Sequence, residues 1–142
     1  MVLVSQPQQT LVLVKPDGVA RNLVGEILAR IEAKGYRIVA LQLRTADAEL
    51  LEQHYAEHVG KPFYAPLAEF MASGPLVAAV IEGHRVIEGI RTLIGATDPT
   101  LALPGSVRGD LASATDAPVH RNLVHASDSP EAAVREIALW FA

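Results

Sequence analysis

The chain has 142 residues, 50% of them hydrophobic and 20% charged, which is the length and composition of one ordered globular domain. It contains no cysteine, which excludes disulfides and thiolate nucleophiles, and its net charge of -4 gives no general attraction to nucleic acid. No apolar run approaches the roughly 20 residues that span a membrane, and no signal peptide is recognisable, so we expect a cytoplasmic protein without membrane contacts.

The first half of the chain reads as a strand, a helix and a second strand, followed by two helical segments. Residues 1–9 form a loose tail, and the apolar, β-branched run at 10–14 predicts a buried strand that ends in a tight turn at Lys15 to Gly18. Apolar residues then recur at helical spacing before Gly35. In chain order, this half holds a helix at 22–34, a strand at 36–44, a helix at 47–58 and a short helix at 63–73.

The second half continues the alternation but contains a long irregular segment. A buried strand is predicted at 76–81 and a helix at 84–94, after which residues 96–121 hold several prolines and glycines without periodicity. Such loops usually carry function. A fourth strand follows at 122–125, and a helix begins at Ser129 and reaches residue 141. The pattern predicts an α/β sandwich with helices packed on a four-stranded sheet, and leaves the strand order open.

His125 lies where a buried strand gives way to a capped helix, with Ser127 and Asp128 directly after it. Glu136, on that helix, is placed to turn back towards the histidine. A carboxylate that accepts from one ring nitrogen fixes the tautomer and leaves the other nitrogen free to attack. A lone histidine is more often a packed structural residue, so the surrounding residues must decide.

The irregular segment is bracketed by residues suited to phosphate. Arg91, Thr97 and Arg108 offer two guanidinium groups and a hydroxyl, and Lys15 adds a cation at a strand end. The sequence has no glycine-rich phosphate loop, so side chains would have to hold the phosphates.

Three further residues are candidates for the same cleft. Tyr55 and His58 fall on one helical face with Leu51, so their polar tips are placed to border it. Phe63 follows a break in the chain, and its spacing alone favours core packing over contact with a base.

Six motifs follow one another over residues 10–141. They are Lys15-Pro16-Asp17-Gly18, His54-Tyr55-Ala56-Glu57-His58 with Gly60-Lys61-Pro62-Phe63, Ser73-Gly74-Pro75, Gly95-Ala96-Thr97-Asp98-Pro99, Pro104-Gly105-Ser106-Val107-Arg108-Gly109-Asp110 and Asn122-Leu123-Val124-His125-Ala126-Ser127-Asp128-Ser129. Together they resemble the nucleoside diphosphate kinases, and six ordered motifs are far more specific than one.

The resemblance implies a ferredoxin-like fold, a four-stranded antiparallel sheet covered by helices, and ping-pong phosphoryl transfer through a phosphorylated His125. It implies that Glu136 orients the histidine, that Tyr55 supports Lys15 and His125, and that Ser127 and Asp128 lie close behind. The implied nucleotide contacts are Lys15 and Asn122 at the sugar, His58, Arg91, Thr97 and Arg108 at the phosphates, and Phe63 with Leu67 at the base.

The resemblance also implies partners. Because every base offers a π-face for stacking, we expect little discrimination among nucleoside di- and triphosphates, including ATP, GTP and deoxynucleotides. Mg²⁺ should arrive on the nucleotide phosphates, with no ligand directly from the protein. A homo-oligomer, hexamer or tetramer, is implied, with contacts near residues 97–110.

The chain departs from the family pattern in two places. Residues 111–121 look several residues longer than usual and introduce Asp116, Pro118 and His120. This extra length either bulges outwards or alters access to the site. Ala126 stands where the family more often has glycine, which tests whether the backbone there accepts a methyl group.

Two other functions compete with this hypothesis. His54-Tyr55-Ala56-Glu57-His58 matches the His-x-x-Glu-His pattern of inverted zinc peptidases, although that reading lacks a third ligand and leaves the arginines without purpose. The other is a non-catalytic nucleotide-binding or assembly module of the same fold. The presence of both His125 and Glu136 argues against it, because a pure binder needs no nucleophile.

Overall fold

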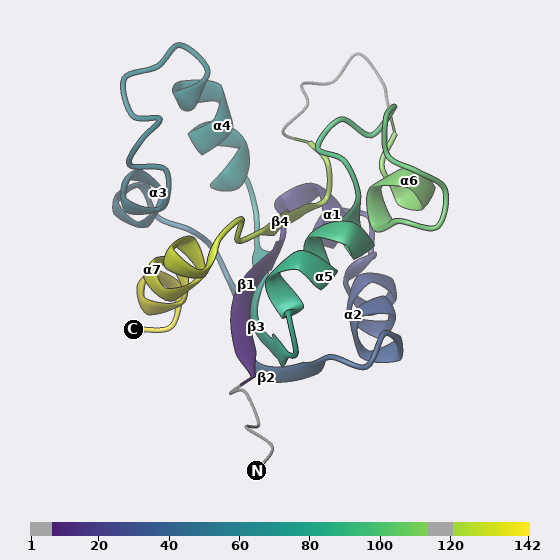
Figure 1. The fold of residues 1–142 in the computed structure, drawn as a ribbon. Helices are drawn as coiled ribbons and strands as arrows, with labels where there is room; N and C mark the ends of the chain where they lie inside the picture. The colour runs from purple at the N-terminus through teal and green to yellow at the C-terminus, as the bar shows by residue number, and fades with distance from the viewer. Residues whose placement is uncertain (1–6, 114–120) are drawn as a thin grey trace.

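A computed structural model describes residues 7–113 and 121–142 as a four-stranded antiparallel sheet with helices on both faces (Figure 1). The strands lie in the order β2-β3-β1-β4. In chain order the elements are β1 (Gln8–Val14), α1 (Pro16–Ala20), α2 (Val24–Ala33), β2 (Arg37–Arg44), α3 (Ala48–His54), α4 (Tyr64–Met71), β3 (Leu76–Gly83), α5 (Val86–Ile94), α6 (Val107–Leu111), β4 (Val124–Ala126) and α7 (Pro130–Trp140).

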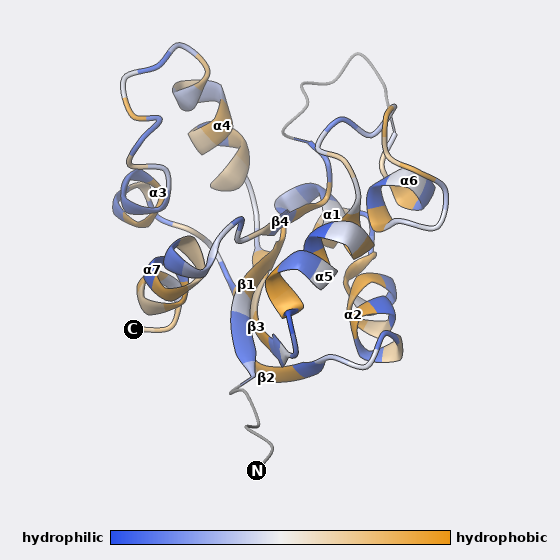
Figure 2. Cartoon of the chain, in the orientation of Figure 1, coloured by the Kyte–Doolittle hydropathy of each residue, from blue (hydrophilic) through white to orange (hydrophobic). Residues whose placement is uncertain are grey.

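The two faces of β1 enter two separate hydrophobic cores, because side chains alternate along a strand. Val12 and Val14 pack with α2 and α5, whereas Leu11 and Leu13 pack with α3, α4 and α7. Figure 2 shows hydrophilic and hydrophobic bands on α2 and α7, as expected of helices that cover a sheet with one face. The predicted four-stranded antiparallel sheet covered by helices is therefore confirmed.

The pairing of β1 with β4 places the histidine. His125 is the antiparallel partner of Leu13, and side chains of directly opposed residues lie on the same face of the sheet. Since Leu13 faces the core formed with α3 and α7, the His125 side chain points to that side. The short strand β4 thus places His125 next to α3, which carries His54, and α7, which carries Glu136.

Two short helices stand where the sequence predicted irregular structure. Residues 16–20 form α1 rather than a simple turn, with Pro16 at the first helical position, where a missing N–H costs nothing. Within the predicted loop at 96–121, residues 107–111 form α6, and the Ser106 side chain caps it by accepting from the Gly109 N–H. Both helices have five residues, too few to show an apolar period.

The helix predicted at 47–58 ends earlier, at His54. Beyond it the chain makes tight turns, with the His58 N–H donating to the Tyr55 carbonyl at 2.8 Å and Gly60 at a φ of 89°. Tyr55 and His58 are therefore brought together by a turn rather than by a shared helical face. Strand β1 also begins two residues before the predicted strand, within the part expected to be a loose tail.

Most of the longer segment noted at 111–121, with Asp116, Pro118 and His120, lies outside the described residues. No helix within the described ranges has both the length and the apolar character needed to cross a bilayer.

Candidate active site

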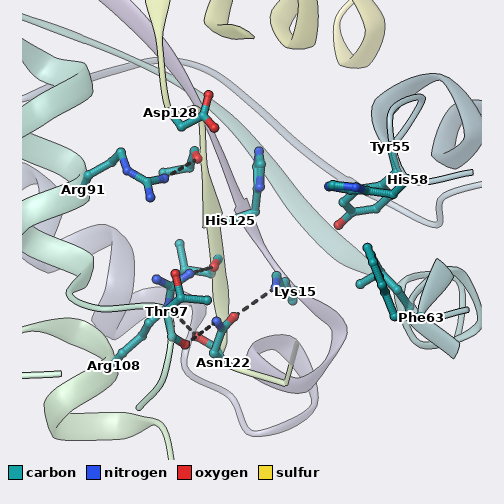
Figure 3. A pocket seen from close by; sticks show the side chains of 13 residues that line it. Lys15, Tyr55, His58, Phe63, Arg91, Thr97, Arg108, Asn122, His125 and Asp128 are labelled. Carbon is teal, nitrogen blue, oxygen red and sulfur yellow. Dashed lines mark hydrogen bonds between the residues drawn. The ribbon is translucent and has the colours of Figure 1, made fainter. Parts of the chain in front are cut away.

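A cavity of about 590 Å³ opens beside β4, and it collects nearly all the predicted site residues (Figure 3). Its lining comes from the end of β1, the segment from Tyr55 into α4, α5 and the loop after it, α6, and β4 with its flanking residues. The lining residues are Lys15, Tyr55, His58, Phe63, Leu67, Arg91, Thr97, Arg108, Asn122, Val124, His125, Ala126 and Asp128. Glu136 and Ser127 do not line the cavity. Glu136 contacts His125, and Ser127 contacts Glu136.

His125 is oriented by a hydrogen bond to Glu136. The His125 Nε2 and Glu136 Oε1 atoms are 2.9 Å apart, and Ser127 Oγ donates to the same carboxylate oxygen at 2.8 Å. Ser127 Oγ in turn accepts from the Leu11 N–H of β1 at 3.2 Å. An ionised carboxylate only accepts, so Nε2 carries the proton and Nδ1 is the unprotonated ring nitrogen.

Glu136 remains ionised in this setting although it is buried. Burial opposes its ionisation, but the hydrogen bonds that the carboxylate accepts from His125 and from the Ser127 hydroxyl help to outweigh that cost, and the pKa of Glu136 lies below its usual range. The Arg135 guanidinium also lies 3.7 Å from Glu136 Oε2. A stable carboxylate is what keeps the His125 tautomer fixed.

Lys15 lies at the base of the cavity within a chain of polar contacts. Its Nζ donates to Asn122 Oδ1 at 2.9 Å, and Asn122 Nδ2 donates to the Thr97 carbonyl at 2.8 Å. Burial, together with the nearby charge of Arg108, lowers the pKa of Lys15 to about 8. An anionic ligand in the cavity would favour the charged form of this lysine.

Arg108 both lines the cavity and holds its walls together. Its guanidinium donates to the carbonyls of Asn122 at 3.2 Å, Gly95 at 3.0 Å and Val124. Three of its five N–H groups are used in this way, which leaves two for a ligand. Burial and the charge of Arg91 lower the pKa of Arg108 to about 10. Arg91 is more exposed and donates to the Ala126 carbonyl at 3.2 Å.

The opposite wall of the cavity is aromatic. Burial raises the pKa of the Tyr55 phenol, and the charge of Glu136 raises it further, so this group stays protonated. The rings of His58 and Phe63 lie 5.2 Å apart, and Phe63 is 50% exposed, which a core residue would not be. Within the described residues, His58 Nδ1 is buried without a hydrogen-bond partner.

The residue that precedes β4 has an unusual backbone. Leu123 has a φ of 76°, a region that favours glycine, and it is held there by two contacts. Its N–H donates to Asp17 Oδ2 at 3.1 Å and its carbonyl accepts from the Lys15 N–H at 2.8 Å. Ala126, by contrast, lies in β4 without a positive φ, so its methyl group causes no backbone strain.

The zinc-site hypothesis at His54 and His58 gains no support from the geometry. In the described part of the chain, the one group of metal-capable side chains close enough to share an ion is His54, His125 and Glu136, without His58. His54 Nδ1 already accepts from the Trp140 indole N–H at 3.0 Å, so the other nitrogen carries a proton. Metal binding would require that proton to leave.

Comparisons with known proteins agree with this geometry. The family described as nucleoside diphosphate kinase matches residues 8–142. A nucleoside diphosphate kinase of Streptomyces coelicolor is 62% identical over 135 residues, 94% of this chain and 96% of the relative. One from Mycobacterium tuberculosis is 60% identical over the same shares.

Solved structures show the same fold. A halophilic nucleoside diphosphate kinase from Halobacterium salinarum, solved in complex with CDP, has a TM-score of 0.89 at 44% identity. A family protein from Babesia bovis has a TM-score of 0.89 at 41% identity. Each comparison covers 95% of this chain and 88% of the other.

The antiparallel sheet and these relatives define a phosphotransferase. More particularly, the chain belongs to the nucleoside diphosphate kinase family.

Proposed function

We propose that His125 carries the phosphoryl group in a ping-pong exchange between nucleoside triphosphates and diphosphates. The observation that carries this proposal is the bond from His125 Nε2 to Glu136, which leaves Nδ1 as the nucleophile beside a cavity lined by Lys15, Arg91 and Arg108. A neutral imidazole with a fixed tautomer needs no additional base to attack phosphorus.

In the first half-reaction, Nδ1 attacks the terminal phosphorus in line as its bond to the bridging oxygen breaks, and the nucleoside diphosphate leaves. Negative charge spreads over the equatorial oxygens, where the free N–H groups of Arg91 and Arg108 offset it. In the second half-reaction, an oxygen of another nucleoside diphosphate attacks the phosphohistidine, and the free imidazole is restored.

The remaining lining residues bind the nucleotide in this proposal. Thr97 and His58 join the arginines at the phosphates, Lys15 and Asn122 contact the sugar, and Tyr55 supports Lys15 and His125. The unpartnered His58 Nδ1 is suited to this role, because a buried polar atom is costly until a partner arrives. Asp128 borders the mouth of the cavity.

Phe63 and Leu67 form the site for the base. The half-exposed Phe63 ring offers a stacking surface that does not distinguish one base from another. We therefore propose that ATP, GTP and their deoxy forms all react. The CDP bound by the Halobacterium relative is consistent with a site that accepts a pyrimidine diphosphate.

The cavity fits magnesium only as a companion of the nucleotide. Among the described residues, Asp128 is the one carboxylate in the lining, whereas a cage for this ion takes several oxygen ligands. We propose that Mg²⁺ is held by the phosphates and water. It would neutralise phosphate charge, while Arg91, Arg108 and Lys15 supply the charge that belongs to the protein.

A homo-oligomer, either a hexamer or a tetramer, is also part of this proposal, as is action in the cytoplasm. The support for self-association is surface chemistry: Leu41 and Leu43 on β2, and Leu101 and Leu103 in the loop before α6, are exposed large apolar side chains. Apolar groups gathered on two faces are typical of contact surfaces.

The test is direct labelling of the protein with radioactive phosphate from Mg-ATP. We expect a label that is stable in alkali and lost in acid, and we expect His125→Ala to abolish it. His84→Ala, at an exposed histidine outside the cavity, serves as the matched control and should label fully. A label that persists in His125→Ala would overturn the proposal. Nucleotide binding without any label would instead favour the non-catalytic module.

A further inference from the structure

A second histidine touches His125 from outside the cavity. His54, the last residue of α3, is only 3% exposed and does not line the cavity. The His54 and His125 rings lie edge to face, with centroids 4.6 Å apart and an interplanar angle of 75°. His54 has no role in the proposed phosphoryl transfer.

The His54 ring is held on its other side. The Trp140 indole N–H donates to His54 Nδ1 at 3.0 Å, and the two rings lie 5.6 Å apart at 84°. Trp140 is itself fixed to β2, because Arg44 donates to its carbonyl at 2.9 Å and places its guanidinium 5.5 Å from the indole ring. The His54 backbone is also tied to α7, through Arg135.

His54 remains neutral beside His125. Burial and the proximity of His125 lower the pKa of His54 to about 3, so the His54 ring is uncharged at any ordinary pH. Because the His54 ring is neutral, it does not repel His125 electrostatically when His125 is protonated. The polar ring is tolerated in the core because Trp140 satisfies its acceptor nitrogen.

The plane of the His125 ring needs more than Glu136 to define it. Within residues 7–113 and 121–142, the ring makes one hydrogen bond, to Glu136. Rotation of an imidazole about its second side-chain torsion is broad, so one bond at Nε2 leaves the direction of Nδ1 loosely set. A rigid ring packed at 4.6 Å removes that freedom.

We propose that His54, anchored by Trp140, is a positioning residue that fixes the plane of the His125 ring and so directs Nδ1 towards the nucleotide. This rests on the proposed role of His125 as the nucleophile. Phosphoryl transfer depends on in-line geometry, so loss of this contact should slow phosphorylation while leaving nucleotide binding intact.

The principal test is His54→Asn, whose side-chain oxygen still offers Trp140 an acceptor but which has no ring for His125. In single-turnover reactions with Mg-ATP, we expect phosphorylation to slow by on the order of tenfold. The nucleotide Kd should change by less than about twofold, since His54 does not line the cavity. The ¹⁵N NMR signals of the His125 ring should change and broaden, because a ring that is no longer held in one plane samples several orientations.

Rescue separates positioning from general packing. His54→Phe restores a ring beside His125 and should recover part of the rate, although it leaves the Trp140 N–H unsatisfied and lowers the free energy of unfolding. Leu51→Ala is the matched control, because Leu51 is buried on the same helix and in the same core. It should destabilise the protein without changing the rate or the His125 signals.

If His54→Asn does not fold, Trp140→Phe tests the anchor instead, since it removes the indole N–H and keeps an aromatic ring, although the smaller ring also costs some packing in the core. The proposal predicts a slower phosphorylation and a shifted His54 Nδ1 signal in that variant. A wild-type rate with unchanged His125 signals in the folded variant would overturn it, as would an equal loss of rate in Leu51→Ala. Failure of His125 as nucleophile would appear separately, as an unlabelled wild-type protein.

Discussion

Lys15 shows how the fold sets the chemistry of one residue. It is buried near Arg108 and bonded to Asn122, so the fold gathers positive charge at the base of the cavity. This arrangement costs folding free energy and favours phosphate binding, because an anion relieves the repulsion. The charge on this lysine therefore depends on both pH and the presence of a nucleotide.

The pKa of Lys15 predicts an alkaline decline in nucleotide capture. As pH rises through about 8, the free enzyme loses the Lys15 charge, and kcat/KM should fall. Lys15→Met should be slower at all pH values and should lack this decline. A decline that persists near pH 8 in Lys15→Met would show that another group causes it.

The same group acts on stability with the opposite sign. The unfolded chain keeps the Lys15 proton up to about 10.5, whereas the folded chain loses it at about 8. Between these values the unfolded state binds more protons, so the Lys15 contribution to the free energy of unfolding rises with pH. Nucleotide capture and this part of stability should thus diverge over that range.

At the scale of elements, the sequence predicted those helices and strands that depend on a local pattern of apolar and capping residues. The strand at β3 begins at the predicted residue, and α5 and α7 lie within the predicted helices, because their apolar periods are long and their caps are clear. Helix α6 was hidden in a proline-rich and glycine-rich segment because it is too short for a period. The strand order depends on pairing between distant segments, which local pattern does not encode.

The residues of the candidate site also divide into those that the sequence predicted and those that it did not. Residues with exposed polar chemistry, such as Arg91 and Thr97, stand out in the sequence and come together at the cavity. His54 did not stand out as a partner of His125, because its role depends on burial and on Trp140, 86 residues away. Val124 and Ala126 were also missed, since their place in the lining follows from the path of β4 rather than from their chemistry.

Helix α6 gives a prediction at this scale. A Cβ at Gly109 would lie 2.0 Å from the Leu103 carbonyl oxygen, so Gly109→Ala should shift α6 and with it Arg108. We expect a loss of roughly 2–4 kcal/mol in the free energy of unfolding and weaker nucleotide binding, measured by denaturant titration and calorimetry.

Gly25→Ala is the control for this prediction. Gly25 lies in α2 with nothing within 4 Å of an added Cβ, so alanine should be neutral or stabilising. Equal stability of the Gly109→Ala and Gly25→Ala variants would mean that the contact between α6 and the preceding loop is not tight.

For the whole molecule, the two edges of the sheet differ. β4 forms one edge and has three residues, whereas β2 forms the other with eight, and Leu41 and Leu43 on it are 53% and 68% exposed. A long apolar edge strand readily pairs with another chain. We therefore expect β2 to be one of the surfaces through which copies of this protein associate.

Leu43→Lys tests that expectation, because a charge at an apolar contact disfavours burial. Light scattering should report a smaller mass than for the wild type. Val134→Lys, at a 74% exposed position on α7, makes the same chemical change elsewhere and should leave the mass unchanged. An unchanged mass in Leu43→Lys would place the association surface away from β2.

The packing of Trp140 on His54 has a practical consequence. Trp140 is the only tryptophan among the 142 residues, and one imidazole separates it from His125. Indole emission responds to nearby charge and hydrogen bonding, so the protein contains its own optical probe next to its reactive group. We therefore expect that, if His125 carries phosphate as proposed, its phosphorylation changes the fluorescence of Trp140, and that the reaction can be followed in unlabelled protein through this single side chain.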